Sequence, residues 1–127
     1  MPAPATSGVL IYAKTLPVMS AFYEQVLEAR VLLADAEHRV LQTQDTQLIL
    51  HAIPEAFGRS VVIDVPPVPR ETQAIKPFFT VGTLAEAETI VERCGGRVWG
   101  PLWSGPGLRV RNVCDPEGNI LHLRERV

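Results

Sequence analysis

Apolar and polar positions follow two alternating patterns along this chain, one typical of amphipathic helices and one typical of strands. Apolar residues recur every three or four positions in two segments, residues 17–29 and 84–94, and each segment predicts a helix. Shorter segments are rich in aliphatic and β-branched residues and predict strands at residues 8–13, 30–33, 39–43, 47–53, 76–81, 97–99, 109–114 and 120–124. The predicted order is therefore strand, helix and three strands, repeated once.

The ends of the two predicted helices carry different signals. Pro17 is placed where a missing backbone N–H does no harm, at the start of the first helix. Thr83 and Glu86 have the spacing of a capping box at the start of the second. A glycine pair, Gly95-Gly96, predicts the end of that helix, because one glycine readily takes the left-handed conformation.

The two halves are related by a nearly constant offset. Leu16 and Leu84 are 68 residues apart, and Arg30 and Arg97 are 67 apart, which indicates an internal duplication. Neither half is large enough for a stable core of its own, so we expect the halves to pack as one domain. We expect a single domain over residues 1–127, with a first module at about 8–54, a proline-rich linker at 55–75 and a second module at about 76–126.

Composition and charge exclude several classes of partner. The 127-residue chain is 46% hydrophobic and 20% charged, with a formal net charge of −2, so we expect a globular protein that does not bind nucleic acid. No apolar run is long enough for a membrane helix, and the first residues do not resemble a signal peptide. Cys94 and Cys114 are expected to be free thiols. A cytoplasmic protein with no membrane partner is the expectation that follows.

Two short motifs carry a resemblance to a known family. Phe22-Tyr23 near the end of the first helix and Asp115-Pro116-Glu117-Gly118-Asn119 before the last strand resemble the vicinal oxygen chelate superfamily. That group includes glyoxalase I, extradiol dioxygenases, and fosfomycin- and bleomycin-resistance proteins, and the resemblance, closest to small glyoxalase-like domains, covers residues 8–126. It implies an α+β fold in which two βαβββ modules curl their mixed sheets around one cleft. Relatives often dimerise, so it also implies a homodimer.

The resemblance also implies where a metal would be held, and here the residues depart from the family. The four ligand positions fall on Gly8, His51, Lys76 and His122. Glycine has no side chain, and a lysine ammonium repels a cation and has no lone pair to donate. We therefore expect no functional metal. If Zn²⁺, Ni²⁺ or Fe²⁺ is bound, His51 and His122 are the expected ligands.

Other residue types in the predicted cleft suit ligand binding. Alternation along the first strand places Tyr12 on the same face as Gly8. Glycines and prolines around Trp99 and Trp103 predict an irregular loop at residues 99–107, which suits flat apolar ligands. Three cations could pair with a carboxylate ligand: Lys76, Arg109 and Arg111. Each of these residues also has an ordinary structural alternative, as a core, loop-covering or solvated side chain.

Three functions stay open from the sequence. The first is a metal-independent protein that binds an aromatic or anionic small molecule, similar to bleomycin-resistance proteins. The second is a lyase, isomerase or dioxygenase of the same superfamily that uses His51 and His122 as metal ligands or as acid and base. The third is an interaction module that keeps the fold without a small ligand.

Overall fold

The computed structural model describes residues 5–127 and contains the predicted duplication. The first module comprises β1 (Gly8–Ala13), α1 (Leu16–Val26), β2 (Arg30–Ala34), β3 (His38–Gln42) and β4 (Gln47–Ala52). The second comprises β5 (Phe78–Val81), α3 (Leu84–Arg93), β6 (Arg97–Gly105), β7 (Leu108–Cys114) and β8 (Ile120–Arg126). A short helix that the sequence analysis missed, α2 (Glu55–Gly58), lies in the linker. Within residues 5–127 no helix is long and apolar enough to cross a membrane.

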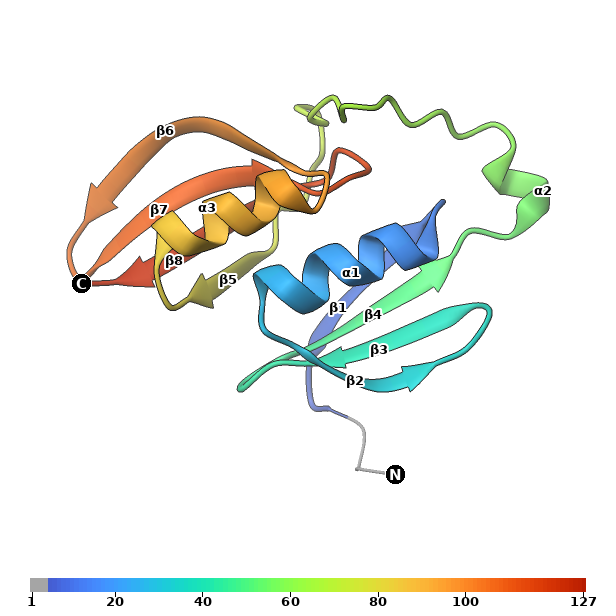
Figure 1. Ribbon diagram of the computed structural model, residues 1–127, viewed down its shortest axis with the longest axis horizontal. Helices are drawn as coiled ribbons and strands as arrows, with labels where there is room; N and C mark the ends of the chain where they lie inside the picture. The colour runs from blue at the N-terminus through green and yellow to red at the C-terminus, as the bar shows by residue number, and fades with distance from the viewer. Residues whose placement is uncertain (1–4) are drawn as a thin grey trace.

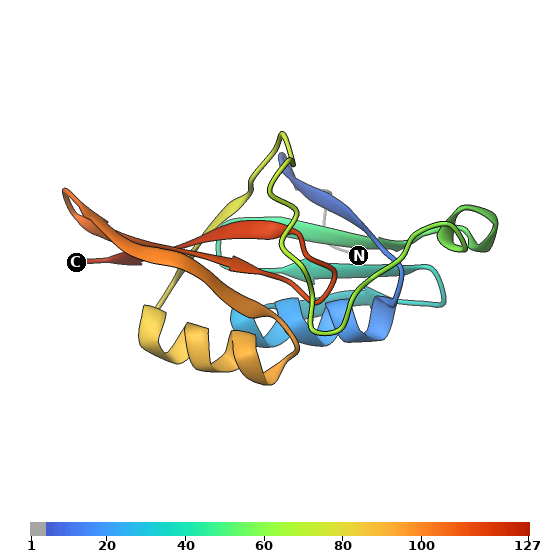
Figure 2. The ribbon, with the colours of Figure 1, turned by 90° about the horizontal axis from the view of Figure 1, so that it is seen from above.

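The two sheets have the same topology. The strand order is β1-β4-β3-β2 in one and β5-β8-β7-β6 in the other, with β1–β4 and β5–β8 parallel and the remaining pairs antiparallel. Each helix packs on one face of its own sheet, so both sheets keep a second face without a helix (Figures 1 and 2). We call these the helix-free faces. The sheets do not close on each other, and large apolar side chains such as Tyr12 and Trp103 stay more than half exposed on them.

The prediction of an irregular loop at residues 99–107 is wrong for most of that segment. Strand β6 continues through Trp103 to Gly105. Gly100 and Pro101 lie where the pairing of β6 with β7 is irregular, between Trp99 and Trp103. Gly100 has a φ of 84°, which only glycine adopts without strain. Strand β6 is an edge strand, where Pro101 costs no ladder hydrogen bond.

The two modules meet at the motifs that carry the family resemblance. The Tyr23 hydroxyl on α1 donates a hydrogen bond of 2.7 Å to the buried Asp115 carboxylate. Glu117 is also buried, and its two carboxylate oxygens accept from the backbone N–H groups of Lys14 and Thr15, at 2.8 Å each. We call these contacts the module joint. They hold α1 and the two residues that precede it against a turn about 100 positions away in the sequence.

The linker is bonded to the second module along its last part. Arg70 donates two hydrogen bonds to the β7–β8 turn, from its backbone N–H to the Gly118 carbonyl and from its Nε to the Glu117 carbonyl. Gln73 pairs its side-chain amide with the backbone N–H and carbonyl of Ile120. A Cβ at Gly118 would collide with the Val68 carbonyl oxygen, so this close approach requires glycine.

Candidate functional site

The residues predicted for the site occupy three separate places. Tyr12 and His51 are neighbours on the helix-free face of the first sheet, with ring centroids 5.4 Å apart. The registers place Trp99, Trp103 and His122 on the helix-free face of the second sheet, and Lys76 precedes its edge strand β5. Arg109 and Arg111 alternate with the residues of that face and lie on the opposite side of β7, toward α3.

The helix-free face of the second sheet is organised in rows across its four strands. One row runs Phe78, His122, Asn112 and Trp99, because each residue is the register partner of the next. The next row runs Thr80, Arg124, Val110 and Trp103. In the first row, the polar side chains of the two central strands are therefore flanked by aromatic rings from both edge strands. In the second row, an aromatic ring is present on the β6 edge alone.

Three polar atoms on this face are buried and have no hydrogen-bond partner. They are the Oδ1 of Asn112, the Nε2 of His122 and the Nε of Arg124. Leaving such a group unpaired costs about 1–3 kcal/mol, so a cluster of them requires an explanation. Together they offer one acceptor, one donor and one imidazole nitrogen to a bound molecule.

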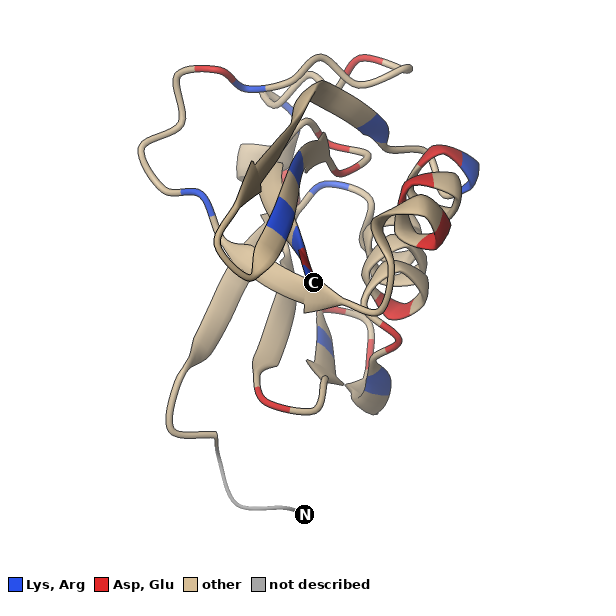
Figure 3. Cartoon of the chain, turned by 90° about the vertical axis from the view of Figure 1, so that its left-hand side faces the viewer, with Lys and Arg blue, Asp and Glu red and all other residues tan. Residues whose placement is uncertain are grey.

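The charge around this cluster is positive. The Arg124 guanidinium lies over the Phe78 ring, 4.0 Å from its centroid. Burial, followed by the charges of Arg124 and Lys76, lowers the pKa of His122, so its imidazole is neutral at pH 7. Figure 3 shows several basic residues on strands of the second sheet, among basic and acidic residues elsewhere on the chain. Among the described residues in the two rows there is no carboxylate to oppose these cations.

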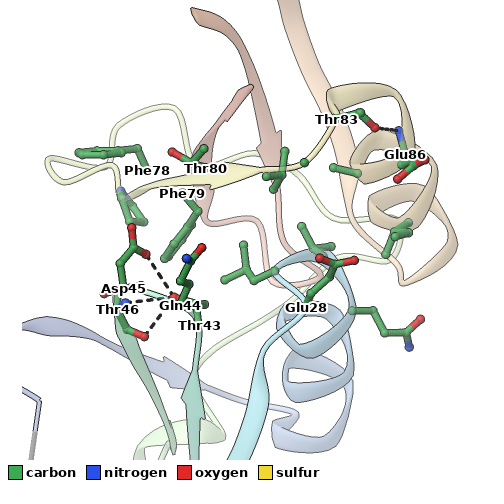
Figure 4. A pocket seen from close by; sticks show the side chains of 18 of the residues that line it. Glu28, Thr43, Gln44, Asp45, Thr46, Phe78, Phe79, Thr80, Thr83 and Glu86 are labelled. Atoms are coloured by element: carbon green, nitrogen blue, oxygen red, sulfur yellow. Dashed lines mark hydrogen bonds between the residues drawn. The ribbon is translucent and has the colours of Figure 1, made fainter. Parts of the chain in front are cut away.

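A pocket of about 740 Å³ lies between the two modules. Its walls come from the end of α1, the β3–β4 turn, strand β5 and the start of α3 (Figure 4). Lys76 is the one predicted site residue that lines it, and Phe78 joins it to the aromatic rows. Carboxylates and cations both line this pocket, and none of its lining residues carries a buried unpaired polar atom within residues 5–127. The rows of the second sheet are therefore the stronger candidate site.

The two arginines on the other face of β7 have partners of their own. The Arg111 Nε lies 3.1 Å from a Glu88 carboxylate oxygen on α3, and the Arg109 guanidinium lies 3.6 Å from Glu125 on β8. The first ion pair joins α3 to β7, and the second links neighbouring strands of the same sheet on its helix side. The geometry therefore separates both arginines from the aromatic rows.

Sequence reasoning missed three members of the candidate site: Phe78, Asn112 and Arg124. Strand alternation holds a signal for Arg124, which is two positions after His122 and so shares its face. Asn112 is the one uncharged polar residue in the segment Leu108–Cys114. The register between β7 and β8, which places Asn112 beside His122, was not predictable from either strand alone.

The residues at the four positions where the resemblance implies metal ligands do not fit a divalent cation. A Cβ added at Gly8 would collide with the Gln47 carbonyl oxygen, so no donor side chain enters there without a shift of the backbone. The charges of Lys76 and Arg124 act on His122, whereas His51 belongs to the other sheet. Within residues 5–127, no three His, Cys, Asp or Glu side chains are grouped for a metal.

The sequence matches no protein-family model and no curated protein. Solved structures do match the fold over nearly the whole chain. A glyoxalase/bleomycin resistance protein/dioxygenase family enzyme from Burkholderia phytofirmans PsJN is 18% identical, with a TM-score of 0.72, over 98% of this chain and 100% of that one. The fosfomycin resistance protein FosX from Mesorhizobium loti is 13% identical, with a TM-score of 0.68, over 99% and 95%.

A third match is a bleomycin-binding protein solved in complex with bleomycin. It is 18% identical, with a TM-score of 0.61, and the match covers 98% of this chain and 100% of that one. The duplicated βαβββ topology and these matches agree with the resemblance carried by Phe22-Tyr23 and the Asp115–Asn119 turn. This chain therefore has the glyoxalase/bleomycin-resistance fold.

Proposed function

We propose that this protein binds a small planar anion on the helix-free face of its second sheet, without a metal. The observation that carries the proposal is the cluster of three buried, unpaired polar atoms on Asn112, His122 and Arg124, on strands that neighbour aromatic side chains. A ligand that pairs with these atoms recovers their desolvation cost. The matched protein that binds bleomycin has the same fold, which supports small-molecule binding as the general role.

The chemistry of the rows selects the class of ligand. Aromatic side chains such as Phe78 and Trp99 favour a flat conjugated molecule. Arg124 and Lys76 favour a carboxylate or a similar anion, and the carboxamide oxygen of Asn112 accepts a hydrogen bond from a ligand N–H or O–H. The proposed ligand is therefore an aromatic or heteroaromatic carboxylate with a hydrogen-bond donor.

A metal-dependent enzyme receives less support from the same residues. Its ligands would be His51 and His122, which belong to different sheets, and a positive environment around His122 disfavours a cation there. Binding of an anion at the two rows of the second sheet does not depend on a metal, so it needs no further metal ligands beside these two histidines. We infer that the donor set, rather than the fold, separates this chain from metal-using relatives.

The test is a titration of the tag-free protein with planar aromatic and heteroaromatic carboxylates, each compared with its neutral amide, by tryptophan fluorescence and calorimetry. We expect carboxylates to bind and amides to bind more weakly. Lys76→Met and Arg124→Met should each weaken a carboxylate by about 10- to 100-fold, which corresponds to the 1.5–3 kcal/mol of a charge-assisted hydrogen bond.

The matched control is Arg109→Met, since Arg109 is on the same sheet but on its other face. We expect this variant to bind like the parent protein. Equal binding of acids and amides, or equal losses in Arg109→Met and Arg124→Met, would show that the second-sheet rows do not select an anion.

A further inference from the structure

Two of the three histidines in this chain form a pair on the first sheet, away from the proposed ligand site. His38 on β3 and His51 on β4 are direct register partners in an antiparallel ladder. The Ala52 N–H donates to the Glu37 carbonyl at 2.8 Å, so the adjacent residue pair is the hydrogen-bonded one. His38 and His51 therefore form a non-hydrogen-bonded pair, the kind in which opposite side chains are closest.

The two imidazoles are in contact and lie on a face that no helix covers. Their ring centroids are 4.5 Å apart, with the planes at 75°. Tyr12 lies beside His51 on β1 and is 58% exposed. Solvent therefore has access to this part of the sheet.

Each imidazole has an oxygen partner at the same ring atom. His51 Nδ1 lies 2.7 Å from the carbonyl oxygen of Ala52, and His38 Nδ1 lies 3.2 Å from a carboxylate oxygen of Asp35. Carbonyl and carboxylate oxygens only accept, so Nδ1 carries the proton in both neutral rings. The lone pair of each ring is then on Nε2. An imidazole oriented through Nδ1 by a carbonyl or carboxylate is the usual arrangement of a histidine that ligates a metal.

We propose that His38 and His51 form a two-histidine site for a divalent transition-metal ion, which they bind through their Nε2 atoms. Imidazole nitrogens suit Zn²⁺, Ni²⁺ and Cu²⁺ rather than Mg²⁺ or Ca²⁺. Asp35 positions His38 and is not itself a ligand. Since no third protein ligand is grouped with the pair within residues 5–127, the remaining coordination positions are open to water or to an exogenous ligand.

This site differs from the four positions implied by the fold. It shares only His51 with them, and it lies wholly on the first sheet. It also stands apart from the proposed anion site, whose residues belong to the second sheet. The two proposals therefore succeed or fail separately.

The experiment is a calorimetric titration of tag-free, chelator-treated full-length protein with ZnCl₂ and NiCl₂ at pH 7.5, and with MgCl₂ as the comparison ion. We expect one equivalent of Zn²⁺ or Ni²⁺ to bind, and no Mg²⁺. His38→Gln and His51→Gln should each weaken binding at least tenfold. Asp35→Asn should weaken it by about 10-fold while leaving the stoichiometry unchanged, as expected of a positioning residue.

The third histidine provides the matched control. His122→Gln removes an imidazole from the other sheet and should leave Zn²⁺ affinity unchanged. No binding at about 1 mM metal, or binding that survives His38→Gln, overturns the proposal. Binding lost in His122→Gln but kept in His38→Gln would instead assign the metal to the family positions, and would also contradict the metal-free function proposed above.

Discussion

Helices α1 and α3 occupy equivalent places in the two modules, yet their N-termini are satisfied in different ways. Thr83 caps α3 locally, with its hydroxyl accepting from the Glu86 N–H at 3.3 Å. Thr15 precedes α1 and makes no side-chain cap; its own N–H donates instead to Glu117 of the other module. The start of α3 is therefore capped within its own module, whereas the start of α1 is bonded to the other module.

The Asp115–Asn119 turn therefore has a structural role, because it bonds the second module to α1. Asp115 accepts hydrogen bonds from the Tyr23 hydroxyl and from the backbone of its own turn, and Glu117 accepts two from the start of α1. Burial raises the pKa of Tyr23 well above its usual value, so the phenol stays protonated and donates. The two motifs that identify the fold therefore bind each other, and neither contributes to the candidate site.

Glu117→Gln should have the largest effect on the contact between α1 and the second module. The amide keeps one acceptor but turns an NH₂ group toward a backbone donor, so one charged hydrogen bond becomes a repulsive contact and the other weakens. We expect a loss of about 3 kcal/mol in the free energy of unfolding, measured with urea. Thr83→Ala removes the local cap of α3 and should cost only about 1 kcal/mol. Equal losses would contradict the asymmetry between the two helices.

A smaller effect is expected at the aromatic side of the module joint. Tyr23→Phe keeps the ring packed against Phe22 but removes the donor to Asp115. We expect a loss of about 1.5–3 kcal/mol, since a buried carboxylate is left with fewer partners. A double-mutant cycle with Asp115→Asn separates this bond from general packing, and an absence of coupling between the two substitutions would place the hydroxyl outside the joint.

Cys114 reports on the joint because it directly precedes Asp115. Burial, and then the Asp115 carboxylate, raises the pKa of Cys114 to about 11, whereas Cys94 at the end of α3 is partly exposed. With a thiol reagent at pH 8, we expect Cys94 to react first and Cys114 only through opening of the structure. Glu117→Gln should accelerate labelling of Cys114 more than Thr83→Ala does. A Cys94→Ser background removes the competing signal.

The smallest expected effect is on the pH dependence of stability, and it arises from His122 on the second sheet. The pKa of His122 is lowered in the folded protein, so the unfolded chain binds its proton more readily. Stability should therefore fall as the pH drops below about 6.5 through the folded-state pKa. Asn in place of His122 should flatten this part of the curve of unfolding free energy against pH. A curve that His122→Asn leaves unaltered would show that burial and the nearby cations do not lower the pKa of His122 in the folded protein.

Local patterns predicted the elements, and long-range contacts account for what they missed. Periodicity located α1 and α3, and runs of strand-forming residues located the strands to within a few residues, except at the end of β6. The contact at the start of α1 was not predictable, because the carboxylate that accepts from the Thr15 N–H belongs to Glu117, 102 positions away. The path of β6 was missed because Gly100-Pro101 is an ordinary loop signal, and only an edge position makes it compatible with a strand.

In the candidate site too, local patterns predicted some features, whereas others depend on contacts between distant segments. Alternation placed Arg109 and Arg111 together but did not say which face of the sheet they share. His122 was identified through its family position, whereas its neighbours Asn112 and Phe78 depend on the pairing of three strands. A site assembled across strands is specified by register, and register is a property of the folded sheet rather than of any one segment.

The attachment of the linker has a consequence for where this chain tolerates changes in length. Residues 68–73 are fixed against the β7–β8 turn and the start of β8, through Val68, Arg70 and Gln73. Between α2 and that attachment, the segment around Val62 and Val65 is exposed and makes few bonds to the rest of the protein. An inserted peptide or domain therefore belongs at residues 62–65, where it lengthens a bridge between the two halves, and not a few residues later, where it would displace the turn that holds them together.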